Sequence, residues 1–205
     1  MRTIAICLLS LSFLQGCTVV GAAIGAAATA GSAALQERGL TGVLSDAEIE
    51  GTISKAWFDH DFDMFQNLNL KVYEGRVLIT GFVTGDEQRF DAIRLAWKPN
   101  EVKEVINEIL IGNGPTLSQK AKDTWISSQI EGKLLVQSEV LTLNYNIHTI
   151  KGTVYLIGVA QNENALEIVT NIARSIEGVE KVISYVRLKN QNLPPEPEAE
   201  ESPNS

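Results

Sequence analysis

Few side chains in this 205-residue sequence could do catalytic chemistry. There are two histidines, His60 and His148, and two cysteines, Cys7 and Cys17. The sequence contains no recognisable Ser/His/Asp set, CxxC pair or glycine-rich phosphate loop. Its one cluster of metal-ligating residue types is 59–63, Asp-His-Asp-Phe-Asp, which has no match in the second half of the chain and is interpreted as a solvated acidic loop between a helix and a strand. We therefore predict no enzyme activity, no cofactor and no metal site.

Cys17 is the residue best placed for covalent modification. Arg2 gives a short positive region, residues 4–14 are apolar, and Leu14-Gln15-Gly16 leads into the cysteine. This order is typical of a bacterial lipoprotein signal, in which the cysteine is acylated and becomes the mature N-terminus. An ordinary signal peptide or an uncleaved anchor is the alternative. Acylation would supply a lipid anchor, and removal of Cys7 would leave no disulfide framework.

Trp125 is the residue best placed to bind a lipid surface. Lys120, Lys122 and Lys133 lie near it in the sequence, and Gln129 follows it by four positions. An aromatic ring at headgroup depth, with amines directed toward phosphate, is typical of membrane-interface contacts. Whether these side chains are exposed to a lipid surface depends on the secondary-structure element that carries them.

An internal repeat defines that element. Sliding the chain over itself by 77 positions superposes two glycine-bounded apolar runs, 75–83 and 152–160. Apolar residues coincide without a gap over about 65 positions, so the chain holds two copies of one module. Each copy is near the lower size limit for an independent core, and we expect the copies to pack on one another.

Periodicity predicts the order helix, hairpin of two strands, helix, strand in each copy. Glu74-Gly75 and Lys151-Gly152 fit tight turns, and Ser45 with Glu48 fits a capping box that would begin the first helix. In the first copy we expect helices at 45–58 and 86–98 and strands at 68–73, 75–83 and 102–111. In the second copy we expect helices at 118–136 and 164–176 and strands at 145–150, 152–160 and 179–188. The predicted fold class is α+β, two tandem αββαβ domains, each a small sheet with two helices on one face.

The repeat also separates core from surface. Trp57 superposes on Leu134, so its position is apolar in both copies and is predicted to be buried. Trp125 superposes on Glu48, a charged residue, so the ring is predicted to face solvent. The buried stripe of the same helix is predicted to be Ile126, Ile130 and Leu134. Packing of Trp125 against the first copy is the alternative.

The αββαβ order, the Gly-x-Val-x-Leu-x-Gly-type second strand and the turn Gly178-Val179-x-x-Val182 resemble the BON domain of bacterial envelope proteins. Two copies behind a lipoprotein signal resemble the dual-BON outer-membrane lipoproteins, over residues 45–190. One departure is Glu101, which replaces the glycine of that turn in the first copy. The resemblance implies that the helix containing Asp123-Thr124-Trp125-Ile126 binds phospholipid and that the protein supports envelope integrity. Thr18, after the cysteine, favours the outer membrane by analogy with lipoprotein sorting.

The predicted organisation has five parts. These are a signal peptide at 1–16, an acylated Gly/Ala-rich tether at 17–44, BON domains at 45–114 and 115–190, and a disordered acidic Pro/Glu tail at 191–205. Residues 19–35 could instead be a transmembrane span with a small-residue face. Their moderate hydrophobicity favours a tether near the membrane.

Charge divides the two copies. The first copy has 13 acidic and 7 basic residues, net −6, whereas the second has 7 and 8, net +1. An anionic bilayer would repel the first copy and tolerate the second, and the acidic chain disfavours nucleic acid. We expect anionic phospholipid to meet the second copy on the periplasmic face of the outer membrane. The first copy would brace it or meet an envelope protein. The alternative function is an adaptor with Trp125 docked in a protein groove.

Overall fold

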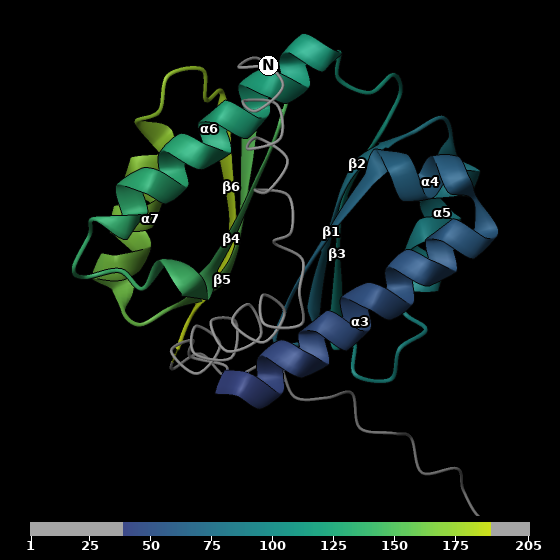
Figure 1. The fold of residues 1–205 in the computed structure, drawn as a ribbon, viewed down its shortest axis with the longest axis horizontal. Helices are drawn as coiled ribbons and strands as arrows, with labels where there is room; N and C mark the ends of the chain where they lie inside the picture. Colours follow the sequence, from purple (N-terminus) through teal and green to yellow (C-terminus); the bar gives the residue numbers. More distant parts are fainter. Residues whose placement is uncertain (1–38, 190–205) are drawn as a thin grey trace, which may run out of the picture.

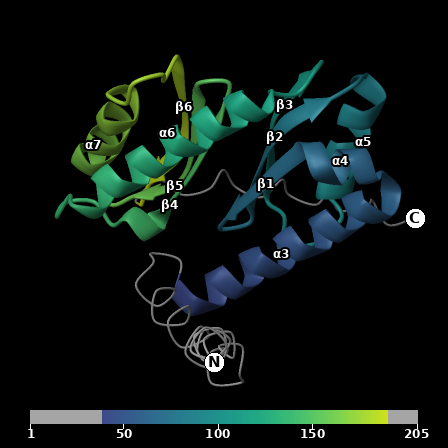
Figure 2. The same cartoon turned by 45° about the horizontal axis from the view of Figure 1, so that its top comes forward.

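The computed structural model describes residues 39–189, which form two α+β units. Each unit has a three-stranded sheet with its helices on one face (Figure 1). The helices lie on the outer sides of the molecule, and the other faces of the two sheets look toward one another (Figures 1 and 2). The predicted α+β class with two tandem copies is therefore confirmed.

The order of elements follows the repeat. In the first copy it is α3 Gly39–His60, α4 Phe62–Asn67, β1 Leu68–Tyr73, β2 Arg76–Val83, α5 Asp86–Ala96 and β3 Glu104–Ile111. In the second copy it is α6 Leu117–Leu135, the 3₁₀ turn η2 Thr142–Asn144, β4 Tyr145–Ile150, β5 Thr153–Ala160, α7 Glu163–Arg174 and β6 Lys181–Leu188. In each sheet the hairpin strands are antiparallel and the last strand runs parallel to the second, because a helix connects them.

Two local predictions for the first copy are wrong. Helix α3 begins at Gly39, so Ser45 lies inside the helix and does not cap it with Glu48. The segment expected to be an acidic loop contains the short helix α4. Asp61 caps this helix by accepting hydrogen bonds from the backbone N–H groups of Asp63 and Met64. The residues of the predicted tether from 39 to 44 are thus helical.

A buried aspartate in each copy ties the first helix to the hairpin turn. Asp46 accepts the N–H groups of Glu74 and Gly75, both at 2.8 Å. Asp123 accepts those of Lys151 and Gly152, at 2.8 and 2.9 Å. All four turn residues have positive φ, as a type I′ turn requires, so the predicted turns are confirmed. The aspartates satisfy turn N–H groups that face the protein.

Each copy has its own hydrophobic core between helices and sheet. In the first copy Ile49, Ile53 and Trp57 of α3 are buried, and Trp57 Nε1 donates to the Ala92 carbonyl at 3.1 Å. In the second copy the buried stripe of α6 is Ile126, Ile130 and Leu134. The predicted buried positions of both helices are therefore confirmed.

A third cluster lies between the sheets and joins the two copies. It contains Tyr73, Leu78, Phe82 and Ile106 from the first copy, with Ile150, Tyr155, Ile157 and Val159 from the second. Polar bonds surround it: Arg76 donates to the Tyr185 carbonyl at 2.6 Å, and the Tyr185 hydroxyl donates to Glu108. The expectation that the copies pack on one another is confirmed.

Within residues 39–189 no helix is long and apolar enough to cross a membrane.

Candidate functional site

Helix α6 carries the predicted lipid-binding residues, and its position is well defined. Thr116 caps it in a capping box with Gln119, and the apolar stripe holds it against β4 and α7. Asp123, two residues before Trp125, is buried and bonded to the β4–β5 turn. Side chains off this stripe are therefore presented on a rigid support.

Trp125 is exposed, with 48% of its surface accessible. It lies off the buried stripe, as predicted from its pairing with Glu48. Because a helix turns by about 100° per residue, Gln129 lies about 40° from Trp125, Lys122 about 60° and Lys133 about 80°. All four side chains are exposed. The structure thus brings Trp125, Lys122, Gln129 and Lys133 together on one face, which we call the Trp125 face.

The two lysines of the Trp125 face lie where α6 meets the end of α7 and the turn after it. Lys133 Nζ is 3.4 Å from Ser175 Oγ. The stem of Lys122 crosses Gly178, where an added Cβ would lie only 2.6 Å from Lys122 Cε. Gly178 also has a φ of +86°, a backbone conformation that favours glycine at this position of the second copy. The first copy has Ser45 opposite Glu101 at the corresponding positions, so a side chain fits there. Neither lysine forms an ion pair within the described residues.

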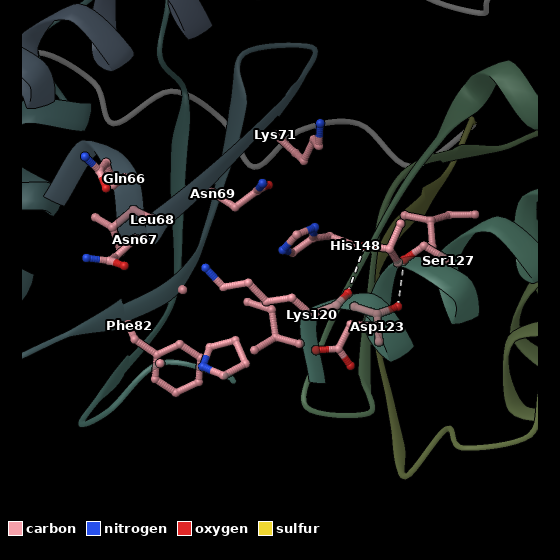
Figure 3. Close-up of a pocket in the computed structure, with 17 residues that line it drawn as sticks. Gln66, Asn67, Leu68, Asn69, Lys71, Phe82, Lys120, Asp123, Ser127 and His148 are labelled. Atoms are coloured by element: carbon pink, nitrogen blue, oxygen red, sulfur yellow. Dashed lines mark hydrogen bonds between the residues drawn. The ribbon is translucent and has the colours of Figure 1, made fainter. Parts of the chain in front are cut away.

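Lys120 stands apart from the other four predicted residues. It lies about 140° around the helix from Trp125, and its side chain lines a cleft between the two copies (Figure 3). A flat surface that contacts Trp125 cannot also contact Lys120. The structure therefore divides the predicted set into an outer face and a cleft.

The acidic segment 59–63 does not converge on one point. Asp59 pairs with Lys55, His60 Nε2 lies 3.1 Å from Asp91, and Asp61 caps α4. The pKa of Asp61 is lowered, chiefly by the hydrogen bond from Gln88. Within residues 39–189 no group of three or more His, Cys, Asp or Glu could hold a metal ion. Cys17, the predicted acylation site, lies outside the described residues, as do 19–35 and 191–205.

Sequence reasoning missed one conspicuous surface. Phe58, Phe62 and Phe65 at the α3–α4 corner are 40–53% exposed and contact one another edge-on or stacked, with ring centroids 5.5–6.3 Å apart. Phe58 precedes the acidic segment 59–63 and Phe62 lies within it, so the signal was present in the sequence. The three rings lie together only in the folded chain, because α4 folds the segment back.

Comparison with known proteins identifies the module. The BON domain family matches residues 45–113 and 122–190. An uncharacterized protein from the gshII 5′ region of Anaplasma centrale is 42% identical over 151 residues, covering 73% of this chain and 99% of that protein. Outer membrane lipoprotein DolP of Haemophilus influenzae is 32% identical over 192 residues, covering 91% and 96%. The 21 kDa hemolysin of Actinobacillus pleuropneumoniae is 36% identical over 123 residues, covering 58% and 63%. With two matched BON domains and this similarity across most of its length, the chain belongs to the family of dual BON-domain lipoproteins.

Proposed function

We propose that this protein is an outer-membrane-anchored periplasmic lipoprotein that binds anionic phospholipid through its second BON domain and supports envelope integrity. The observation that carries the proposal is the exposed Trp125 on a face shared with Lys122 and Lys133. Similarity to an outer membrane lipoprotein over 91% of the chain supports the location. The signal-like segment ending at Cys17 supports the anchor.

The chemistry of the Trp125 face suits the bilayer interface. An indole ring there gains from its apolar body while its N–H meets headgroups. Each lysine near an anionic surface contributes about 1 kcal/mol. The first copy, with its net charge of −6, would be held away from such a surface. A function by binding, rather than by catalysis, fits the absence of a catalytic constellation from the sequence.

A second candidate function is a protein–protein adaptor. The exposed cluster of Phe58, Phe62 and Phe65 favours it, because contiguous exposed aromatic surface commonly marks an interaction site. Its acidic neighbours, Asp59 and Asp63, would favour a basic partner. In this function the first copy meets an envelope protein while the second copy holds the membrane.

Vesicle flotation tests the lipid proposal. A chain lacking the first 38 residues is mixed with vesicles of phosphatidylcholine alone or with added phosphatidylglycerol or cardiolipin. We expect Trp125→Glu to abolish binding to the anionic vesicles. Trp97→Glu is the matched control, because Trp97 is 49% exposed and lies in the first copy.

Equal loss of binding in both variants would point to a general effect of added negative charge. Unchanged binding of the Trp125→Glu chain would remove Trp125 from the membrane contact, whereas a wild-type chain that does not bind the anionic vesicles would contradict the lipid proposal.

A further inference from the structure

The cleft between the two copies has the size of a small-molecule site. Its volume is about 570 Å³, within the range of roughly 300–1,000 Å³ that is usual for ligand pockets. Its walls are β1 from the first copy, and β4 and α6 from the second, with the linker at Gly114 and Pro115. Both copies therefore contribute to one cavity.

Two lysine side chains line this cleft, one from each copy. Lys71 lies on β1 and Lys120 on α6, and neither forms an ion pair with another residue of 39–189. Asp123 also lines the cleft, but its two carboxylate oxygens accept the N–H groups of Lys151 and Gly152. The cleft thus carries an excess of positive charge in a chain whose net charge is −8.

Neutral polar groups complete the lining. His148 and Lys120 extend from the second copy toward β1, which carries Asn69 and Lys71 on the opposite wall (Figure 3). Burial, with a smaller contribution from Lys71, lowers the pKa of His148 to about 4, so its ring is neutral at pH 7. Asn69 Oδ1 is buried and has no hydrogen-bond partner within the described chain. A buried acceptor of this kind gains from a hydroxyl donor.

This lining selects a ligand class. The two lysines act as point charges, and lysine in this role is a common phosphate-binding residue. Hydroxyl groups would satisfy Asn69 and hydrogen-bond to His148. We propose that the cleft binds a small phosphorylated polyol, with its phosphate between Lys71 and Lys120.

The site is independent of the membrane contact proposed above, because Lys120 and Trp125 lie on different sides of α6. The phosphorylated polyol could be a free metabolite or the headgroup of a glycerophospholipid. Both present a phosphate beside hydroxyl-bearing carbons, so the experiment separates the two sources.

The test uses the full chain in nanodiscs and ¹³C-labelled histidine observed by NMR. The chain has only two histidines, so exposed His60 serves as the internal reference for His148. In one arm, phosphatidylcholine nanodiscs are titrated with glycerol 3-phosphate. In the other, phosphatidylglycerol is placed in the nanodisc and no free ligand is added. We expect His148 to shift in at least one arm, saturably in the titration with glycerol 3-phosphate, or relative to phosphatidylcholine nanodiscs in the arm with phosphatidylglycerol. The pKa of His148 should rise, because the bound anion adds negative charge near a ring now surrounded by Lys71, Lys120 and Asp123.

The variant Lys71→Met with Lys120→Met should weaken binding at least about tenfold, since both charged donors are lost. Lys98→Met is the control, because it removes an exposed lysine that lies outside both the cleft and the Trp125 face and should leave binding unchanged. Thermal melting checks that each variant is folded. Inorganic phosphate should bind more weakly than glycerol 3-phosphate.

The proposal is overturned if His148 does not move in either arm at millimolar ligand. It is equally overturned if the double variant binds as well as Lys98→Met. Equal affinity for inorganic phosphate and glycerol 3-phosphate would contradict the assignment of a polyol. Loss of binding on Trp125→Glu alone would place the ligand on the Trp125 face rather than in the cleft.

Discussion

Arg76 Nη1 donates a hydrogen bond to the backbone carbonyl of Tyr185 at 2.6 Å, and these two residues belong to different copies of the repeat. The same guanidinium donates through Nε to Glu104 at 2.5 Å, and its side chain is almost fully buried. One side chain therefore links the last strand of the first copy to the last strand of the second.

Arg76→Ala should lower the free energy of unfolding by about 2 kcal/mol, because it leaves a buried carbonyl and a carboxylate without their charged donor. Urea denaturation of the full chain measures this change. Arg89→Ala is the control, since Arg89 pairs only with nearby Asp86 on the surface and should change stability by less than about 0.5 kcal/mol. Similar effects of the two substitutions would show that the bond across the copies contributes little.

The second copy expressed alone should melt well below the full pair. Separation exposes Ile150, Tyr155, Ile157 and Val159, which are covered by the first copy in the intact protein. Each copy is also small for an independent core. Calorimetry of the separate and joined copies measures the difference. An unchanged melting temperature would mean that the copies fold independently.

His148 should make stability depend on pH. Burial holds its pKa at about 4, against an ordinary value of 6.5, so between these values the unfolded chain binds the proton and the folded chain does not. Its contribution is fully present above pH 6.5 and is lost as the pH falls toward 4, by at most about 3 kcal/mol. Urea unfolding from pH 7 to 4.5 should show a shallower decline for His148→Gln than for wild type. A shared slope for the two chains would refute the assignment.

Trp125→Glu should leave the melting temperature almost unchanged. The ring is exposed, and surface substitutions usually alter stability by less than about 0.5 kcal/mol. Binding of the wild-type chain to anionic vesicles should weaken as salt is added, because exposed lysines act through screened attraction. If Trp125→Glu unfolds the protein, the ring has a structural role and the membrane contact loses its main residue.

Cys17→Ser should abolish acylation. The prediction rests on the apolar segment 4–14, followed by Leu14-Gln15-Gly16. Metabolic labelling with a palmitate analogue should mark the wild-type chain and not the variant. Equal labelling of the two would assign the lipid to another position.

The sequence alone determined the repeat, the order of elements and which face of each helix is buried. These features depend on the local periodicity of apolar residues, and the same periodicity appears in both copies at a constant offset. Trp57 could be predicted as core and Trp125 as surface, because the partner position was leucine in one case and glutamate in the other. The hairpin turns were equally local, since positive φ is a property of adjacent residues.

Only the tertiary structure decided how the copies meet. Strands β2 and β5 are buried on both faces, and their continuous apolar runs are consistent with this burial. Such runs do not reveal what covers the face of each sheet that is turned away from its own helices. Packing of sheet against sheet then created the cleft that Lys120 lines, whereas the separation of Lys120 from Trp125 follows from their spacing on one helix. The roles of Asp46 and Asp123 also depended on folding, because each binds a turn that lies 28 or 29 residues along the chain. Contacts of that kind depend on how the elements pack in space, which local periodicity does not record.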